Sequence, residues 1–204
     1  YVHYTPNETI GGLCLRSIEY SEKPIVADYS SGILSEPIDV NKFSLIYGGA
    51  QKNIGPSGLG FVIIKKDLLG NPQAITPNLL NYTLIHEGES MSNTPPTFAW
   101  YVAGKVFKWL KSLGGVEEIA KINIRKADKL YSYIDGSNFY RNNINKVDRS
   151  IMNVPFLLAN EDLNDKFLEQ SKEAGLLALK GHRSVGGMRA SIYNGLPEEG
   201  VDAL

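Results

Sequence analysis

Apolar residues form short runs in the first third of the chain and helical repeats further on. Glycine and turn residues bound apolar runs at residues 1–4, 24–28, 45–47 and 61–64, and this pattern predicts four short buried strands. Residues 70–94 carry two prolines and several asparagines without a clear period. Such a stretch predicts an irregular excursion that is longer than a usual connection.

Helical spacing begins after Thr94. Residues 95–113 repeat apolar side chains at intervals of three and four, with Thr94 as the expected N-cap, prolines at the first helical positions and a double glycine after the end. Trp100 and Trp109 lie on this helix and are expected to be packing residues rather than residues that stack on a ligand. Further helices are predicted at residues 116–135, at residues 162–174 and from residue 197, and further strands at residues 151–158, 176–179 and 188–193.

Strands and helices are interleaved along the chain, and no internal repeat is present. This order places the protein in the α/β class. The double glycine after residue 113 is the best domain boundary. We therefore expect residues 1–113 to hold mainly parallel-sheet material and residues 114–204 to form a smaller two-layer α/β unit.

Composition and charge exclude several classes of protein. With 43% hydrophobic and 21% charged residues in 204, the chain is globular rather than disordered or fibrous. A net charge of -1 gives no overall field for nucleic acid or anionic membranes. Cys14 is the single cysteine and cannot form an internal disulfide, and no apolar run approaches the ~18 residues of a membrane span. We therefore expect a soluble, cytoplasmic protein. His3 and His86 lack companions at metal-ligand spacing, so we expect no metal site.

The two ends of the chain indicate a fragment. The sequence begins at Tyr1 without a methionine, and no charged and then apolar leader opens it. Residues 197–204 have the pattern of a helix that is cut short. We expect the intact protein to be longer at both ends.

The candidate chemistry centres on a glycine-rich stretch at residues 47–60. It is not a P-loop, because Lys52 precedes the glycine cluster, and its glycines fall as G-x-x-G-x-G rather than as a dinucleotide fingerprint. What remains is a lysine at the exit of a buried strand. Loss of hydration there favours the neutral amine, which can attack a carbonyl group. A solvated loop lysine is the alternative and, for a lone lysine, the more common case.

An aspartate stands at the end of another predicted strand. Asp28 follows the apolar residues 25–27 and precedes a polar turn. A carboxylate that emerges from a buried strand needs a partner, and the protonated ring nitrogen of a pyridine cofactor would be one. The alternative is an aspartate that caps a helix or forms an Asx-turn. The spacing alone leaves both interpretations open.

The chain resembles the phosphoserine aminotransferase family of class-V, pyridoxal-phosphate-dependent enzymes over essentially its whole length. Five stretches carry the resemblance and follow in family order: residues 5–9 (TPNET), 27–31 (ADYSS), 50–56 (AQKNIGP), 93–97 (NTPPT) and 182–191 (HRSVGGMRAS). The resemblance implies the aspartate-aminotransferase-like fold, called fold type I. Residues 1–113 would then be the C-terminal part of the large cofactor-binding domain with its linking helix, and residues 114–204 the small domain, truncated at its last helix.

The resemblance also implies roles around the cofactor, pyridoxal 5'-phosphate. Lys52 would form the Schiff base and then shuttle the proton between substrate and cofactor. Asp28 would pair with the pyridine nitrogen. Thr9 would hydrogen-bond the phenolic oxygen, and Gln51 would bind the phosphate.

Further implied roles lie at a subunit interface and around the substrate. Asn93 and Thr94 would cross the interface of a homodimer to the partner's cofactor phosphate, at a helix N-terminus that favours anions. Arg189 would bind the substrate carboxylate as a bidentate fork, with His182 and Arg183 nearer the phosphate of phosphoserine. Without the resemblance, these three residues would more often be an exposed basic turn.

The implied reaction is the reversible transfer of an amino group between glutamate and 3-phosphohydroxypyruvate in serine biosynthesis, giving phosphoserine and 2-oxoglutarate. In bacteria the family also contributes to pyridoxine biosynthesis. Two alternatives remain: a fold-type-I transaminase with another substrate, and a non-catalytic binding or assembly module. The family's glycine-rich phosphate loop, ring-stacking tryptophan and further substrate histidine and arginine precede the region covered here. We therefore expect the isolated 204-residue chain to be inactive.

Overall fold

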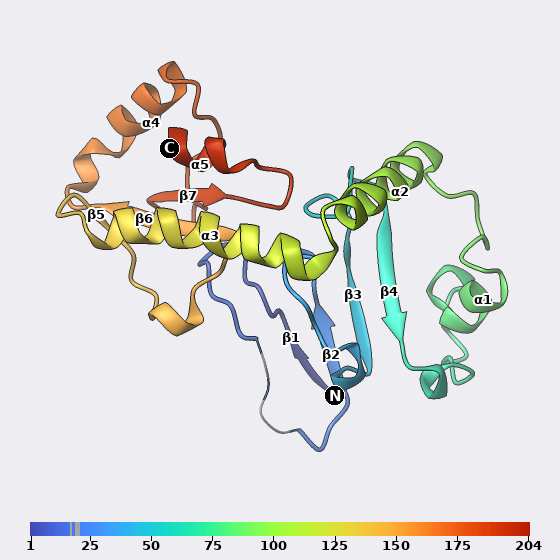
Figure 1. The fold of residues 1–204 in the computed structure, drawn as a ribbon. Coiled ribbons are helices and arrows are strands. Elements are labelled where there is room, and N and C mark those ends of the chain that lie inside the picture. Colours follow the sequence, from blue (N-terminus) through green and yellow to red (C-terminus); the bar gives the residue numbers. More distant parts are fainter. Residues whose placement is uncertain (17, 19–20) are drawn as a thin grey trace.

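The computed structural model describes residues 1–16, 18 and 21–204. Figure 1 shows two sheets lying side by side, with the long helix α3 (Val116–Asp135) running across the end of the first sheet and along the second. The first sheet has the order β1-β2-β3-β4 and the second the order β5-β6-β7. The fold is α/β as expected, although β1 to β4 follow one another without an α-helix in the described residues between them.

The first sheet consists of β1 (Val2–Tyr4), β2 (Ile25–Asp28), β3 (Leu45–Gly49) and β4 (Gly60–Ile64). The four predicted strands are confirmed. β1, β2 and β3 are parallel, whereas β4 pairs antiparallel with β3. Only a turn of ten residues, 50–59, joins β3 to β4, which is too short for the crossover that a parallel pair requires.

The connection from β1 to β2 does not stay with the first sheet. It reaches the part of the chain that holds α3 and the second sheet, residues 114–204, which we call the second body. There Leu13 forms an antiparallel bridge with Arg149, and the Cys14 amide donates to the Asp148 carbonyl at 2.7 Å. Gly12 is required at this crossing: its φ is +74°, and a Cβ there would lie 2.3 Å from the ring of Pro155. The described part of this connection contains no helix, and the one from β2 to β3 contains only the short 3₁₀ helix η1 (Val40–Lys42).

Helix α2 (Thr97–Ser112) follows the excursion, which itself contains η3 (Asn78–Leu80) and α1 (Tyr82–Glu87), and η2 (Lys66–Leu68) lies between β4 and the excursion. The prediction that Thr94 is the N-cap of α2 is wrong, because Pro96 occupies that position. A residue that precedes a proline is disfavoured in the helical conformation, so Thr94 and Pro95 cannot enter the helix. Because it contains η3 and α1, the excursion is less irregular than its sequence suggests.

The second sheet is antiparallel and consists of β5 (Tyr140–Arg141), β6 (Asn153–Leu158) and β7 (Met188–Ser191). α4 (Asn164–Glu173) and α5 (Glu198–Ala203) flank it, with η4 (Lys146–Asp148) and η5 (Glu161–Leu163) in the connections. The predicted strand at residues 176–179 is wrong: only Lys180 forms an isolated bridge, with Met188. The two-residue strand β5 was not predicted.

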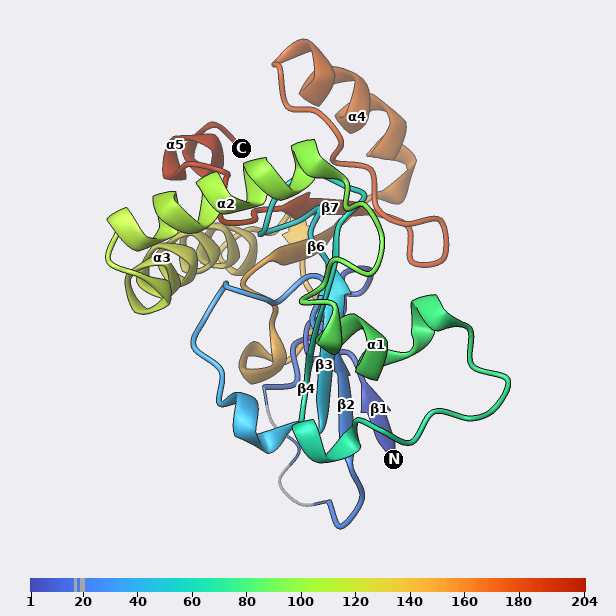
Figure 2. The ribbon, with the colours of Figure 1, turned by 90° about the vertical axis from the view of Figure 1, so that its right-hand side faces the viewer.

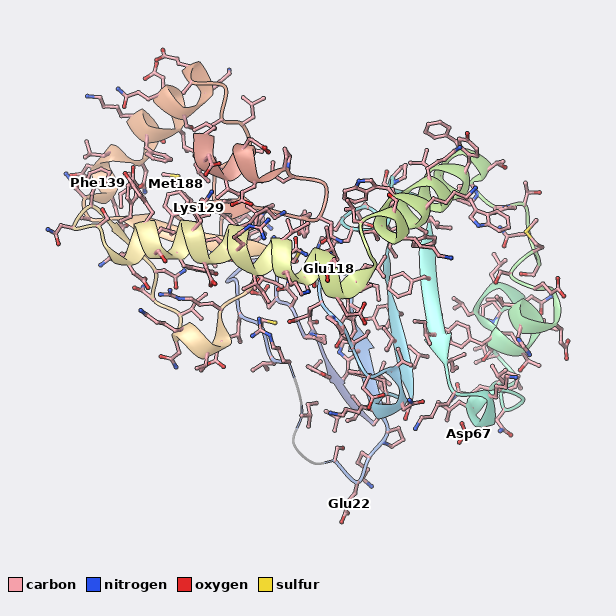
Figure 3. All side chains as sticks on the ribbon, in the orientation of Figure 1. Glu22, Asp67, Glu118, Lys129, Phe139 and Met188 are labelled. Carbon is pink, nitrogen blue, oxygen red and sulfur yellow. The ribbon has the colours of Figure 1, made fainter. Side chains whose placement is uncertain are left out.

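Two hydrophobic clusters support the two sheets. One gathers around Ala27 and Ile46 and receives Ala103 from α2, and the other surrounds β6 and β7 and receives the apolar face of α3. α3 also carries Lys129, which forms ion pairs with Glu198 and Asp202 of α5 (Figure 3). Figure 2 shows α2 and α3 lying across the same end of the first sheet.

Helix α2 exposes aromatic side chains on more than one face. Phe98 and Trp109, 74% and 40% exposed, share one face, and Trp100, 46% exposed, lies on another. Neither tryptophan is buried within this chain, so their packing role stays a prediction. A groove of about 540 Å³ lies beside Trp100, lined by residues that include parts of β4, α1 and α2.

Candidate active site

Four side chains from distant parts of the sequence meet where the parallel strands of the first sheet end. Thr9 follows β1, Asp28 ends β2, Lys52 follows β3, and Arg189 lies on β7 of the second sheet. The carboxyl ends of parallel strands share one edge of a sheet, and ligands of open α/β sheets bind at this edge. Lys52 Nζ donates to Thr9 Oγ1 at 2.7 Å, and Arg189 Nη1 reaches the Thr9 carbonyl oxygen at 3.4 Å.

Lys52 is half-buried, and this burial lowers the pKa of its amine below the ordinary value of a lysine. Asp28 opposes the shift and Arg189 reinforces it. Glu8 adds a smaller opposing effect. A lysine in this balance supplies the neutral amine at lower pH than a solvated lysine does, which suits a nucleophile or a proton carrier.

The position of Thr9 is fixed by the residue before it. The Glu8 carboxylate accepts hydrogen bonds from the amides of Ile10 at 2.8 Å and Gly11 at 2.5 Å. These bonds close a turn around Thr9, so its hydroxyl faces Lys52 and its carbonyl faces Arg189. Glu8 was not recognised from the sequence, although a carboxylate one residue before a polar turn is a usual acceptor for turn amides.

Asp28 forms the Asx-turn that the sequence left open as one interpretation, whereas its pairing with a pyridine nitrogen stays a prediction. Its Oδ1 accepts from the Ser30 amide at 2.9 Å, which is an Asx-turn, and the carboxylate also acts on Lys52. Ser30 Oγ in turn accepts from the Gly49 amide at 3.1 Å, joining this turn to the end of β3. The close packing requires glycine nearby, since a Cβ on Gly48 would lie 2.8 Å from the Ser30 nitrogen.

Arg189 is incompletely bonded. Its Nε is buried and has no hydrogen-bond partner, and its Nη1 makes only the long contact with Thr9. A buried guanidinium N–H without an acceptor is costly, and a carboxylate or phosphate would satisfy it. The donor set therefore fits a compound that brings both an anion and a carbonyl group: an amine, a hydroxyl and a carboxylate lie beside a guanidinium that lacks an acceptor.

Other predicted site residues stand apart from this group. Gln51 is exposed, and its amide folds back over Gly49. His182 and Arg183 are exposed on the loop before β7, where the His182 ring contacts Ser184 Oγ at 2.7 Å.

The pair before α2 also remains outside the cluster. Asn93 and Thr94 are exposed, and Asn93 Nδ2 donates to the Thr94 carbonyl at 3.1 Å. The structure thus brings together four of the nine predicted site residues, namely Thr9, Asp28, Lys52 and Arg189. Among the described residues no cluster of histidine, cysteine, aspartate or glutamate could hold a metal ion.

Comparisons with known proteins agree on one family. The aminotransferase class-V family matches residues 1–204. The phosphoserine aminotransferase of Hahella chejuensis is 62% identical over 100% of this chain and 57% of its own length.

Solved structures give the same result. The phosphoserine aminotransferase from Bacillus circulans subsp. alkalophilus superposes with a TM-score of 0.96 at 44% identity, covering 100% of this chain and 57% of that one. The PLP-bound enzyme of that name from Trichomonas vaginalis gives 0.94 at 40% identity, covering 100% and 58%. The chain thus spans a little more than half the length of these proteins.

Proposed function

This chain belongs to the class-V aminotransferase family and has the aspartate-aminotransferase-like fold, and we propose that the protein it comes from is a phosphoserine aminotransferase. The enzyme moves an amino group between glutamate and 3-phosphohydroxypyruvate and so makes phosphoserine for serine biosynthesis. The observation that carries the proposal is the pairing of a lysine that has one hydroxyl partner with a guanidinium whose Nε has no acceptor. Identity of 62% to a phosphoserine aminotransferase supports the choice of substrate.

The residues of the site fit pyridoxal phosphate. When bound, this cofactor supplies an aldehyde that takes up amines and a ring that accepts electrons. Lys52 is the amine that would hold the aldehyde, and Asp28 is the anion that would face the ring nitrogen. Thr9 offers a hydroxyl on the same side as Lys52 Nζ. PLP-bound and Schiff-base-containing relatives support this assignment.

Each residue of the chain then has a defined task. Lys52, once free, carries a proton to and from the substrate carbon, because its lowered pKa lets the amine change protonation state easily. Arg189 binds the substrate carboxylate through the Nε and Nη groups that Thr9 leaves free. His182 and Arg183 extend from the loop before β7 and would bind the phosphate of phosphoserine. Gln51 would bind the cofactor phosphate.

We further propose a homodimer in the cytoplasm. The exposed aromatic side chains of α2 and the groove of about 540 Å³ beside Trp100 support a covered surface at this place. Asn93 lines this groove, and with Thr94 it would reach the partner's cofactor phosphate. Residues 1–113 would belong to the large domain and residues 114–204 to the small one. None of the helices in the described residues has the length and apolar character needed to cross a membrane.

The test uses the full-length protein. We expect a yellow protein whose visible absorption band disappears on reduction with borohydride, with the cofactor then fixed on the peptide that contains Lys52. Turnover of phosphoserine with 2-oxoglutarate should accompany it. A colourless protein that stays unlabelled with excess pyridoxal phosphate would contradict the proposal and favour a non-catalytic module. Label on Lys52 with turnover of another amino donor would leave the cofactor assignment standing and refute the substrate.

A further inference from the structure

Three buried asparagines connect the turn that carries Lys52 to other segments. This turn spans residues 50–59, and we call it the lysine turn. Asn53, Asn123 and Asn194 are 3%, 0% and 5% exposed. They come from three different places: the turn after β3, the middle of α3, and the segment after β7. We call this set the asparagine relay. Since buried polar side chains are costly unless they are bonded, their partners show what the relay holds in place.

Asn53 connects the lysine turn to two other segments. Its Nδ2 donates to the Ile33 carbonyl at 2.9 Å, and its Oδ1 accepts from the Asn194 amide at 3.0 Å. The turn is also closed internally, because the amides of Ile54 and Gly55 both donate to the Ala50 carbonyl. The internal bonds give the turn its shape, and the Asn53 side chain, beside the Lys52–Thr9 bond and the packing of Ala50 and Ile54 in the core, fixes it against other segments.

Asn194 and Asn123 extend the connection. Asn194 Nδ2 donates to the Leu34 carbonyl at 2.9 Å, and its Oδ1 accepts from Asn123 Nδ2 at 2.8 Å. The same Asn123 Nδ2 also donates to the Ser35 carbonyl at 3.0 Å. Leu34 has φ of +60°, a left-handed conformation that a leucine adopts only when its surroundings impose it. The relay thus fixes a strained turn.

The segments that the relay joins are the ones that carry the site. Asn53 is the residue after Lys52, residues 33–35 end the turn that begins at Asp28, and Asn194 lies five residues after Arg189. We infer that Asn53, acting through Asn194, is the positioning residue of Lys52: it holds the amine against Thr9 and sets its place relative to Asp28 and Arg189. This inference rests on the proposed function, because only there does the position of the amine decide a rate.

If Asn53 only stabilised the fold, its loss would lower stability without changing the environment of the Lys52 amine. Lys52 Nζ has Thr9 Oγ1 as its one described hydrogen-bond partner, and Thr9 sits on another segment. Without the Asn53 bonds the turn would separate from that segment and admit water to the lysine side chain. The groups that act on the amine are Asp28, Arg189 and Glu8, and desolvation is the largest influence. Loosening the turn should therefore be visible in the amine itself and not only in stability.

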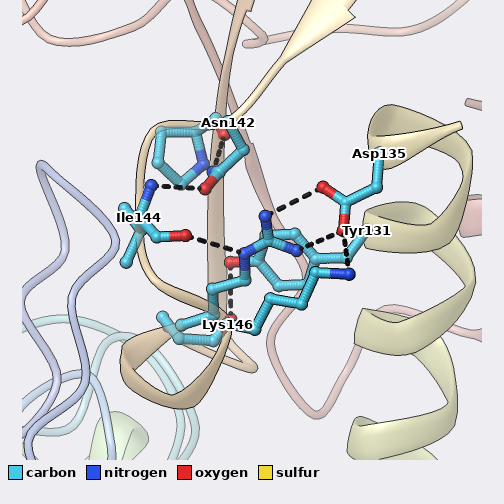
Figure 4. Close-up of polar contacts among 8 residues, drawn as sticks. Tyr131, Asp135, Asn142, Ile144 and Lys146 are labelled. Carbon is cyan, nitrogen blue, oxygen red and sulfur yellow. Dashed lines mark hydrogen bonds and ion pairs between the residues drawn. The ribbon is translucent and has the colours of Figure 1, made fainter. Parts of the chain in front are cut away.

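The matched control is Asn142, which lies in the second body (Figure 4). Its Nδ2 donates to the Pro155 carbonyl at 2.6 Å and its Oδ1 accepts from the Ile144 amide at 2.9 Å. Asn53→Ala and Asn142→Ala therefore remove the same kinds of bond, one donated to a carbonyl and one accepted from an amide. Only the bonds of Asn53 lie beside Lys52.

The experiment uses the full-length protein and two readouts. In the cofactor-free form, the pH dependence of labelling by a small amine reagent gives the pKa of Lys52. In the holoenzyme, kcat is measured with phosphoserine. We expect Asn53→Ala to raise the pKa of Lys52 toward the ordinary value of a lysine and to lower kcat roughly ten- to a hundredfold, because small displacements of a reacting group cost this much. Asn142→Ala should change neither.

Conservative variants complete the test. Asn53→Asp keeps an acceptor for the Asn194 amide and should restore part of kcat relative to Asn53→Ala. Asn194→Ala keeps its own amide for Asn53 and should give smaller changes in the same direction, which decides the matter if Asn53→Ala does not fold. Equal effects of Asn53→Ala and Asn142→Ala, or a lower melting temperature with an unchanged pKa of Lys52, would overturn the inference. Since labelling needs no cofactor, failure of the proposed function would leave this readout intact.

Discussion

A fully buried lysine and a half-buried one are bonded in opposite ways in this molecule. Lys126 on α3 is fully buried, and its Nζ donates to three carbonyls, those of Ile192 and Tyr193 at 3.0 Å and Leu196 at 2.9 Å. An ammonium group has three N–H donors, so every donor has an acceptor. Lys52 has a single hydroxyl partner. The first lysine is part of the scaffold, and the second keeps donors free for a ligand.

Two arginines repeat the contrast. Arg149 in the second body donates to both oxygens of Asp135, at 2.8 and 2.9 Å, and to the Ile144 carbonyl, and its guanidinium lies over the Tyr131 ring at 4.6 Å (Figure 4). Arg189 has a buried Nε with no acceptor. The two regions therefore differ in how completely their cations are hydrogen-bonded rather than in residue type. A cation with an acceptor at each nitrogen stabilises the fold, whereas one with a nitrogen that lacks an acceptor marks the place where a ligand is needed.

The largest expected effect separates the two lysines. Lys52→Ala in the full-length enzyme should abolish phosphoserine turnover and borohydride-dependent labelling, since no other amine occupies that position. Lys126→Met should retain both activities in the folded protein. Turnover and peptide mapping of the two variants measure the difference. Residual turnover by Lys52→Ala would refute the assignment of this lysine.

The next effect concerns the carboxylate beside Lys52. Asp28→Asn keeps the shape of the side chain and can still accept from the Ser30 amide, but it removes the charge. We expect cofactor labelling on Lys52 to persist while kcat falls by about 10²- to 10⁴-fold, the range typical of lost proton-transfer assistance. If Asp28→Asn kept the wild-type kcat, Asp28 would serve only to form the Asx-turn.

Lys126, whose three donors all have acceptors, should make the stability of the protein depend on pH. Burial lowers the pKa of Lys126 to about 8, with Glu198 opposing the shift. The unfolded chain, with an ordinary lysine pKa near 10.5, binds more protons than the folded one between these values, so this contribution makes stability rise with pH across that window. The gain is on the order of 3 kcal/mol. Thermal unfolding of wild type and Lys126→Met from pH 7 to 11, at one protein concentration, should show the stability difference shifting in favour of the wild type as pH rises, because the other titrating groups are common to both proteins.

The smallest effect compares the arginines. Arg189→Lys replaces a fork by a point charge, and we expect KM for the amino acid to rise by roughly ten- to a hundredfold with an unchanged melting temperature. Arg149→Lys should do the reverse: it loses the bidentate pair with Asp135 and lowers the melting temperature while KM stays the same. Steady-state kinetics and calorimetry on both variants test this exchange, and a common response of the two would contradict the comparison.

The sequence predicts long, strongly periodic elements better than short ones. The helix at Val116–Asp135 agrees with its prediction at both ends, because a continuous apolar face and flanking glycines define it. β5 has two residues and carries no pattern of its own. The false strand at residues 176–179 has the apolar composition of a strand, but its carbonyls and amides find no continuous partner there.

For the site, Lys52 and Asp28 stand at strand ends, but their spacing alone leaves a solvated lysine and a simple Asx-turn open, and the family resemblance is needed to assign their roles. The role of Arg189 likewise comes from that resemblance. Its contact with Thr9 joins residues 180 positions apart in the chain, and no local pattern contains such a contact. Glu8 bonds the amides of Ile10 and Gly11, so its role is local. The role of Asn194 becomes visible only in the fold, because its partners Asn53 and Asn123 are distant in sequence.

The crossing of residues 5–15 into the second body has a consequence for synthesis on the ribosome. Asn7 Nδ2 bonds both Ser31 and Asn153, the latter 146 residues away, so the segment that follows β1 has only part of its partners until β6 has been made. Contacts of such sequence separation slow folding, because a long loop must close before they form. Lys52 leaves the ribosome before Arg189 and Asn194, so its surroundings are completed only after those residues have been made. A nascent chain released before residue 189 carries the lysine without this arginine.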